Sequence, residues 1–212
     1  MGALFEPLLL YIILFLSNSA GQISRETISV TPGGELYRIF MYNIPSLALI
    51  WYLLYRNHGF KPGMLKPRKS DLVSAVFALP GLALTGFAIA LISPYFSGIP
   101  QGPAVSGASG ISAWLILTLS CISTGYLEES FFRYYLLSKR EEMGLSPVKA
   151  ALVSTLLFSI CHIYEGPWGF LNAVLSGFLL SFIFLRYRSL HGIALSHGLY
   201  NILVYVVMAQ HL

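Results

Sequence analysis

The sequence predicts an all-α protein whose helices cross a lipid bilayer. Hydrophobic residues make up 56% of the 212-residue chain, charged residues only 10%, and the mean hydropathy is +0.70. These values lie outside the range of water-soluble globular domains. The apolar stretches are continuous rather than alternating, which favours helices because a spanning backbone must satisfy its own hydrogen bonds. We therefore expect a polytopic transmembrane helical bundle that forms a single membrane domain over residues 1–212.

Seven apolar segments account for most of the chain, and each is expected to form one spanning helix. A helix needs about 20 residues to cross the hydrocarbon core, and the fifth and seventh segments lie near the lower limit of this length. The two longest polar stretches between them are loop-sized and are punctuated by proline and glycine. The predicted segments are 3–20, 36–55, 72–96, 111–137, 147–164, 168–187 and 192–208.

Lysine and arginine are distributed unevenly over the loops and predict the orientation of the bundle. Basic residues concentrate between segments two and three, four and five, and six and seven, whereas the 97–110 loop has no charge. By the positive-inside rule the N-terminus is then cytoplasmic and the C-terminus external. The net charge of +4 reflects this topology. Without a binding motif it does not indicate a nucleic-acid partner.

The first segment is interpreted as a retained helix rather than a signal peptide. Glu6 and Pro7 precede its apolar run, and no positive charge does, whereas a signal peptide begins with a positively charged region. Cys121 and Cys161 both lie within apolar segments, so neither a disulfide framework nor a zinc knuckle is indicated.

The fourth segment carries three charged side chains, Glu128, Glu129 and Arg133, in an otherwise apolar stretch. Each costs roughly 2.5–3.5 kcal/mol at bilayer depth, so such residues usually face a protein interior or a wet cavity and serve a function. Glu129 and Arg133 are spaced i,i+4 and can pair on one helix face, whereas Glu128 points about 100° away. We expect a structural Glu129–Arg133 ion pair and a different partner for Glu128.

Polar residues also occur in the fifth and seventh segments. His162 follows Phe158 by four residues, and His197 precedes Asn201 by the same spacing. A carboxylate, two imidazoles and an amide can supply a general base, proton transfer and oxyanion donors, which together suit hydrolysis of an acyl bond. The GxSxG nucleophile motif is absent from the sequence. Cys121 is a weaker candidate nucleophile, because small cysteines are common in helix packing.

The same residues form three motifs of a known family. EESFFR at 128–133 is similar to the EExxxR motif of the CPBP family, which includes CAAX prenyl endopeptidases (type II) and bacteriocin-processing or Abi-like self-immunity proteins. Phe158 and His162 resemble its FxxxH motif, and His197 and Asn201 its HxxxN motif. The motifs occur in the family's order within 111–208, which we take as the catalytic half. The resemblance implies an intramembrane endopeptidase of the glutamic type.

Carried over residue by residue, the resemblance implies that Glu128 is the general base on a water molecule and that His162 assists it. His197 and Asn201 would stabilise the oxyanion. A structural, supporting role is implied for the two remaining motif residues, Glu129 and Arg133. The expected substrate is a membrane-anchored protein or hydrophobic peptide, and no cofactor is favoured. Short loops suggest a multi-pass protein of a prokaryotic inner membrane.

Three other interpretations remain open. A zinc-dependent protease would use Glu128, His162 and His197 as ligands, although the HExxH spacing is absent. A non-catalytic membrane scaffold would use the same polar residues as contacts between helices. A secondary transporter would use Glu128 as a proton-coupled carboxylate, but it is expected to show repeated halves with broken helices, which the sequence lacks.

The depth of the candidate residues makes a further prediction. If the fourth helix continues to Gly144, Glu128 lies about 24 Å above that end, whereas His197 lies only about 8 Å above Gly192. The two side chains can share a site only if the seventh helix is tilted or offset. We therefore predict such an offset.

Overall fold

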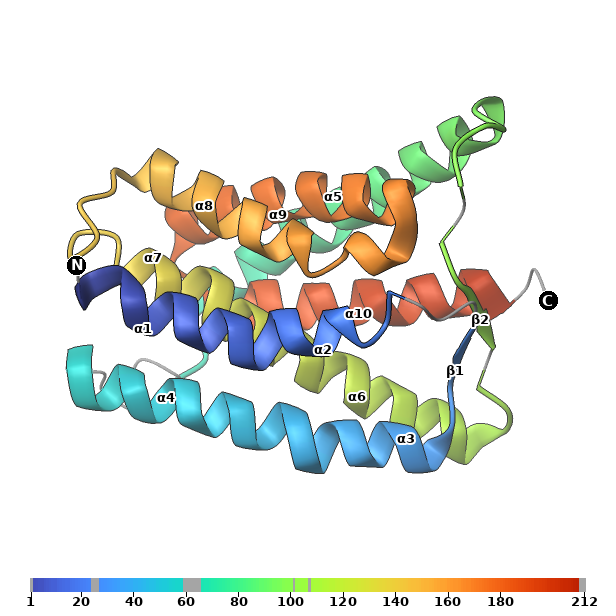
Figure 1. Cartoon of the computed structure of the whole chain (residues 1–212), viewed down its shortest axis with the longest axis horizontal. Coiled ribbons are helices and arrows are strands. Elements are labelled where there is room, and N and C mark those ends of the chain that lie inside the picture. Colours follow the sequence, from blue (N-terminus) through green and yellow to red (C-terminus); the bar gives the residue numbers. More distant parts are fainter. Residues whose placement is uncertain (1, 24–26, 59–65, 101, 107, 210–212) are drawn as a thin grey trace.

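The computed structural model describes residues 2–23, 27–58, 66–100, 102–106 and 108–209. Over these residues every one of the seven predicted segments is helical, which confirms the all-α prediction. Each predicted segment forms one elongated helical unit, here called a rod. The seven rods lie broadly alongside one another, and the two chain ends lie at opposite ends of the bundle (Figure 1).

Several rods consist of α-helix interrupted by a short π-helix or 3-10 turn. The first half of the chain contains α1 (Gly2–Leu10), η1 (Tyr11–Leu16), α2 (Ser17–Ala20), β1 (Thr27–Ser29), α3 (Pro32–Tyr37), η2 (Arg38–Asn43), α4 (Ile44–His58), α5 (Lys69–Ile92), η4 (Ser93–Tyr95) and β2 (Ala104–Ser106). The second half contains α6 (Ile111–Glu129), η5 (Ser130–Tyr135), α7 (Leu136–Ser138), α8 (Pro147–Ile160), η6 (Ile163–Glu165), α9 (Gly166–Tyr187) and α10 (Leu190–Ala209).

Four helices among the described residues are long and apolar enough to cross a membrane: Lys69–Tyr95, Ile111–Ser138, Ile163–Tyr187 and Leu190–Met208. Two further apolar helices, Leu4–Ala20 and Pro147–Ile160, are shorter. The rod at 32–58 does not meet the same combined requirement of length and hydropathy. The bundle therefore combines four helices that meet the length and hydropathy requirement with three helical segments that do not.

Local sequence signals explain where several helices begin. Thr31 and Ser146 cap α3 and α8 through their hydroxyl oxygens, and each is followed by proline at the first helical position, where its missing N–H costs nothing. The Asp71 carboxylate accepts a hydrogen bond from the Arg68 backbone N–H at the start of α5 (2.6 Å). These caps satisfy N–H groups that have no partner within the helix.

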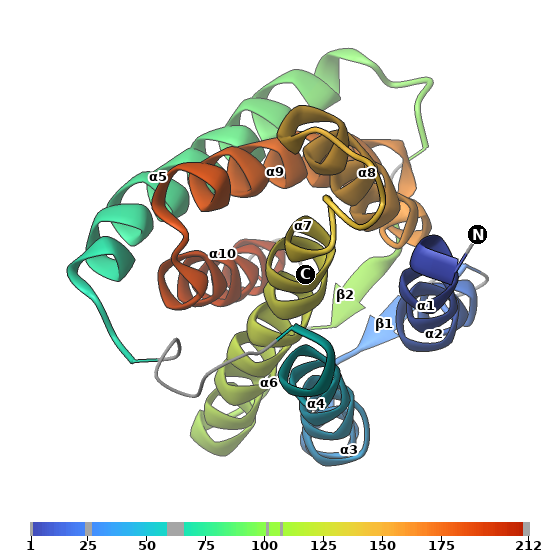
Figure 2. The same cartoon turned by 90° about the vertical axis from the view of Figure 1, so that its left-hand side faces the viewer.

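The rod α6–η5–α7 runs through the middle of the bundle. Viewed along the bundle, it lies between α10 and α5 on one side and α4 on another, with α8 and α1 beside it (Figure 2). Its closest helical neighbour is α10, which packs against both α6 and α5, while α9 packs against α5 and α8. Residues on the central rod can therefore contact almost every other helix.

Two short strands close the end of the bundle at which the chain terminates. β1 and β2 pair in parallel, with Ile28 opposite Val105. They join the loop after α2 to the loop after α5, on the side where the C-terminus lies (Figure 1).

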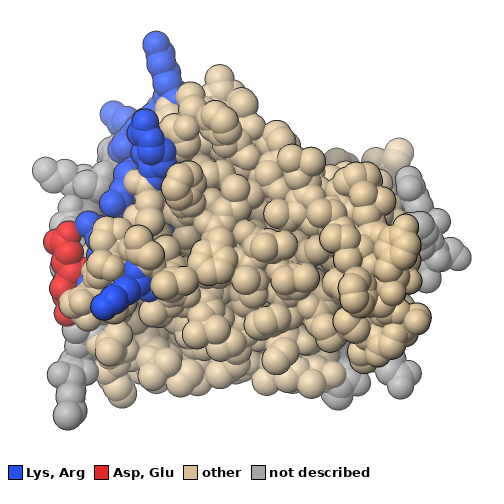
Figure 3. All heavy atoms as spheres, turned by 90° about the horizontal axis from the view of Figure 1, so that it is seen from above, with Lys and Arg blue, Asp and Glu red and all other residues tan. Residues whose placement is uncertain are grey.

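Charged side chains gather at the opposite end. In Figure 3, Lys and Arg residues cluster at one end of the visible face, and the remainder of that face carries neither basic nor acidic groups. This arrangement fits the loop distribution of basic residues, which predicts one basic membrane boundary.

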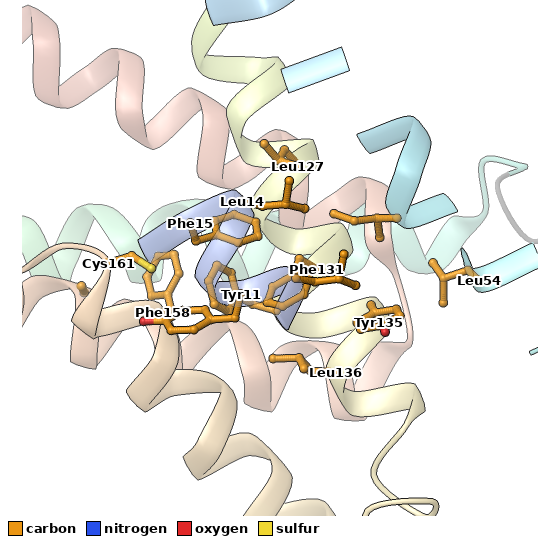
Figure 4. Packing of buried hydrophobic residues seen from close by; sticks show 14 residues of the cluster. Tyr11, Leu14, Phe15, Leu54, Leu127, Phe131, Tyr135, Leu136, Phe158 and Cys161 are labelled. Atoms are coloured by element: carbon orange, nitrogen blue, oxygen red, sulfur yellow. The ribbon is translucent and has the colours of Figure 1, made fainter. Parts of the chain in front are cut away.

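Aromatic packing surrounds the η5 segment. Phe131 and Phe132 are fully buried, and both rings lie 4.8 Å from the ring of Phe15 on η1. Figure 4 shows Tyr11, Phe158 and neighbouring side chains converging on the same cluster. Lipid tails are as apolar as these side chains, so close van der Waals contact rather than expulsion of water holds the helices together.

Two glycines allow α6 and α10 to approach closely. A Cβ built on Gly125 would lie 2.6 Å from the Ala194 carbonyl oxygen and 2.8 Å from the Gly198 amide nitrogen. A Cβ on Gly198 would lie 2.8 Å from Ile122 Cα. Backbone therefore touches backbone at this crossing, as is typical of small residues between membrane helices.

We predict that Gly125→Ala destabilises the bundle by about 1–3 kcal/mol, because the new methyl group forces two backbones apart. The free energy of unfolding can be measured by titration with SDS from mild detergent micelles, followed by circular dichroism. Gly33→Ala is the matched control, since nothing lies within 4 Å of a Cβ built there. Equal transition midpoints for the two variants would contradict the close packing.

Candidate active site

The paired glutamates sit where the central rod changes its helical geometry. Glu128 and Glu129 are the last residues of α6, and the π-helix η5 begins at Ser130. π-helical turns are rare and occur frequently at functional sites. The turn carries Arg133 and brings it onto the same face as Glu129, so a single stretch of chain supplies three of the charged groups.

Glu129 and Arg133 form the predicted ion pair. Arg133 Nη1 donates to Glu129 Oε1 at 3.1 Å, and both side chains are completely buried. Arg133 Nη2 also donates to the Gly177 carbonyl oxygen of α9 (3.4 Å), and its guanidinium lies 4.5 Å from the Phe158 ring centroid. The pair thus connects the central rod to α9 and α8.

His197 of α10 lies between the two glutamates. Its Nδ1 donates to Glu129 Oε1 at 2.8 Å, and its Nε2 faces Glu128 Oε2 at 3.6 Å. The longer separation exceeds that of a hydrogen bond. Glu129 therefore fixes the orientation of the imidazole and leaves Nε2 directed towards Glu128. The sequence assigned Glu129 to Arg133 alone and did not reveal this second partner.

The predicted offset between the helices is smaller than the sequence suggested. The central rod ends at Ser138 rather than Gly144, so Glu128 lies only about 15 Å above its end. Helix α10 begins at Leu190, which places His197 about 10 Å above its start. Close packing of α6 against α10 at Gly125 and Gly198 compensates for the remaining difference in height. The side chains of Glu128 and His197 therefore lie next to each other.

Glu128 differs from its neighbour in exposure. Its side chain keeps 15% of its surface accessible, whereas that of Glu129 keeps none. Glu128 Oε2 is buried and has no hydrogen-bond partner among the described residues. The carboxylate also interacts electrostatically with Tyr42 and Tyr164. A polar oxygen in this position can accept a proton or a hydrogen bond from a bound molecule.

His162 lies just beyond the end of α8 rather than on a helix. The helix ends at Ile160, and the 3-10 turn η6 (Ile163–Glu165) leads from it to Gly166 at the start of α9. His162 Nδ1 donates to the Phe158 carbonyl oxygen at 2.8 Å, which leaves Nε2 as the acceptor in the neutral ring. Its contacts run to Phe158 and Tyr164.

Phe158 links the two imidazoles. Its ring centroid lies 4.4 Å from that of His162 and 5.7 Å from that of His197, and Arg133 covers the same ring. The sequence marked Phe158 only as a motif position. Its ring is a shared surface that sets the positions of three polar side chains.

The structure thus brings most of the predicted site residues together, some in direct contact with one another and others only through a neighbour. Glu128, Glu129, Arg133 and His197 form one network, and His162 joins it through Phe158. The last predicted residue, Asn201, lies one turn beyond His197 on α10 and is half-buried.

Cys121, the weaker nucleophile candidate, lies outside this network. It is 2% exposed and packs in an apolar cluster with Val30 and Leu117. This packing agrees with the expectation of a structural cysteine.

Metal coordination was the closest alternative, through Glu128, His162 and His197. Within the described part of the chain, no three His, Cys, Asp or Glu side chains lie together so that they could hold a metal ion. Both histidines are hydrogen-bonded through Nδ1, His162 to the Phe158 carbonyl oxygen and His197 to Glu129, so each keeps its Nε2 for another partner.

Asn43 is a buried polar residue that the sequence analysis did not single out. It lies on η2, and its Nδ2 donates to Ser123 Oγ (2.7 Å) and Thr124 Oγ1 (3.0 Å), one turn before Glu128 on α6. An amide within an apolar helix often bonds across to a neighbouring helix, so an isolated asparagine in the second segment was an available signal. Asn43 fixes the rod at 32–58 against the part of α6 that carries the glutamates.

Comparison with protein families matches residues 110–203 to the family described as Type II CAAX prenyl endopeptidase Rce1-like. The match confirms the resemblance drawn from the three motifs, and it contains all of them. It covers slightly less than half of the chain. Comparisons with curated proteins and with solved structures found no match.

We predict that Arg133→Met destabilises the protein by about 3–5 kcal/mol, because it leaves the buried Glu129 carboxylate without its cation. Adding Glu129→Gln should recover much of this loss, since the second change removes the uncompensated charge. Unfolding in SDS measures both effects. Arg140→Met is the control: its partner Glu141 is 81% exposed, so about 0–1 kcal/mol is expected. A loss as small as the control's would show that the buried pair is not needed.

Proposed function

We propose that this integral membrane protein, whose residues 110–203 match the Rce1-like type II CAAX prenyl endopeptidases, hydrolyses a peptide bond in a membrane-anchored or hydrophobic substrate. Water is the nucleophile and Glu128 is the general base. The observation that carries the proposal is the placement of His197 between two glutamates, one fully buried and paired with Arg133, the other partly exposed.

The positions of Glu128 and His197 suit activation of one water molecule. Glu128 Oε2 and His197 Nε2 are 3.6 Å apart, so a single water can lie within hydrogen-bond distance of both. Glu128 takes a proton from this water as its oxygen attacks the carbonyl carbon of the peptide bond. Positioned proton transfer of this kind contributes roughly 10²–10⁴-fold to the rate.

Attack converts the substrate carbonyl oxygen into an oxyanion, which needs hydrogen-bond donors. His197 supplies an Nε2–H when its ring is protonated, because Nδ1 already donates to Glu129. Asn201 supplies its amide one helical turn further along α10. Donors fixed before the reaction stabilise the developing charge without reorganisation.

The reaction ends when the C–N bond breaks and the proton held by Glu128 passes to the leaving nitrogen. His162, whose ring is fixed by the Phe158 carbonyl oxygen, assists this transfer through Nε2. Glu129 and Arg133 keep the imidazole of His197 in place and do not touch the substrate. No covalent intermediate with the protein is formed in this scheme.

We predict that Glu128→Gln lowers peptide cleavage roughly 10²–10⁴-fold, because the amide cannot accept the proton. The assay uses purified protein in detergent with a fluorogenic membrane-anchored peptide. Glu141→Gln, at an exposed surface glutamate, should retain full activity.

The same assay separates the remaining interpretations. Activity that persists with a zinc chelator supports water activation by Glu128, whereas loss with chelator and recovery with zinc would favour the zinc-dependent protease. Cleavage that survives Glu128→Gln would refute Glu128 as the base. A scaffold would keep its cellular function in this variant.

We further predict that Asn201→Ala lowers kcat by about 10²–10³-fold with little change in KM, because it removes a donor that acts on the oxyanion rather than on the bound substrate. Initial rates over a range of peptide concentrations give both constants. Asn18→Ala, at an exposed position of α2, serves as the control. An increase in KM with unchanged kcat would instead assign Asn201 to substrate binding.

A further inference from the structure

A concave site lies at the basic end of the bundle. It is a cavity of about 200 Å³ between the start of α5, the end of α7 and the turn that joins α9 to α10. A water molecule takes up about 30 Å³ in the liquid, so the cavity has room for a group of several heavy atoms. None of the residues that line it belongs to the site around Glu128.

Three cations from two separate segments line this cavity: Lys66 and Arg68 before α5, and Arg188 after α9. Among the described lining residues only Asp71 is acidic, and its two oxygens accept hydrogen bonds from the Arg68 backbone N–H (2.6 Å) and the Ser189 hydroxyl (2.5 Å). The nearby Arg140 pairs with Glu141 at 2.8 Å. The lining therefore carries an excess of positive charge.

The surroundings of Arg188 also disfavour its positive charge. Burial and the neighbouring Arg140 guanidinium lower the pKa of Arg188, and Glu141 only partly opposes them. Arg188 is also the one non-glycine residue with positive φ (51°) among the described residues, and its guanidinium lies 5.7 Å from the Phe184 ring centroid. The fold thus holds a cation against like charge in a conformation that costs free energy, and a bound anion would relieve the repulsion.

Hydrogen-bonding side chains complete the lining. Tyr134, Ser138 and His191 reach the cavity from the central rod and from α10. The His191 ring is oriented by the Tyr126 hydroxyl, 2.9 Å from its Nδ1. Cations together with hydroxyl and imidazole groups are the donors that a phosphate group requires.

The cavity lies at the basic end of the bundle, where the distribution of lysine and arginine predicts a membrane boundary. Helix α5 begins at Lys69, α9 ends at Tyr187 and α10 begins at Leu190, so all three helix ends meet around it. Basic pockets between membrane helices at the cytoplasmic side are typical sites for phosphate-bearing lipid headgroups. A ligand at this level can keep its acyl chains against the apolar exterior of the helices.

We propose that this cavity binds the phosphate of an anionic lipid headgroup through Lys66, Arg68 and Arg188. The site is separate from the proposed peptidase chemistry, and it can be tested whether or not cleavage is observed.

The experiment measures bound lipid by native mass spectrometry of the detergent-solubilised full chain. Phosphatidylglycerol and phosphatidylcholine with identical acyl chains are titrated against wild type, Lys66→Gln/Arg188→Gln and the control Arg56→Gln/Lys149→Gln. The control removes the same net charge from basic residues that do not line the cavity. Each cation near a membrane surface contributes about 5-fold to binding of an anionic lipid, so the cavity variant should bind phosphatidylglycerol about 30-fold more weakly. The control should change little.

Equal retention of phosphatidylglycerol by wild type and the cavity variant would overturn the proposal. The wild-type preference for phosphatidylglycerol over phosphatidylcholine gives a second readout that does not depend on folding of the variant, and absence of any preference would also overturn it. Inorganic phosphate is added as a competitor. Displacement of the lipid at micromolar phosphate would reassign the cavity to a free anion, whereas persistence of the bound lipid supports the headgroup.

Discussion

The buried charge of Arg133 constrains the whole bundle. A guanidinium without solvent exposure in a membrane-embedded protein must find compensation from its neighbours. It does so through Glu129 on its own rod, the Gly177 carbonyl oxygen of α9 and the ring of Phe158 on α8. Helix α10 then completes the network, because His197 bonds the same carboxylate oxygen that Arg133 does. The mutual arrangement of four helices thus follows from the neutralisation of one ion.

Close approach of the helices makes these polar contacts possible. Glycine at 125 and 198 brings α10 against α6, and Gly177 lies where a Cβ would meet Thr155 Cγ2 at 2.9 Å. Exclusion of water gives little attraction between helices in lipid, so tight packing and interhelical hydrogen bonds carry the stability. The glycines and the charged network therefore depend on each other. The small residues let the backbones approach closely, and this approach places the charged side chains within bonding distance of their partners.

Two adjacent glutamates acquire different chemistry from this arrangement. Glu129 is enclosed by a cation and an imidazole, which both engage one of its oxygens and hold its side chain in place. Each glutamate keeps one oxygen that no described residue satisfies, but only the Glu128 side chain is partly accessible. His197 lies between the two carboxylates. Its Nδ1 bonds to the buried Glu129, and this bond orients the ring so that Nε2 faces the partly exposed Glu128. This coupling explains why a structural ion pair lies beside the proposed general base.

Patterns in the amino-acid sequence were enough to predict the seven helical segments, the basic end of the bundle and the polar residues within the helices. They could do so because a bilayer imposes strict limits on helix length and on the position of every charge. They also separated Glu128 from Glu129, since 100° per residue sets directions within one helix. The packed bundle was needed to reveal that His197 lies beside both glutamates, that Phe158 contacts both histidines and that Asn43 bonds to α6. Those contacts depend on the rotation, depth and end of each helix relative to its neighbours, which the spacing of residues within a single helix does not specify.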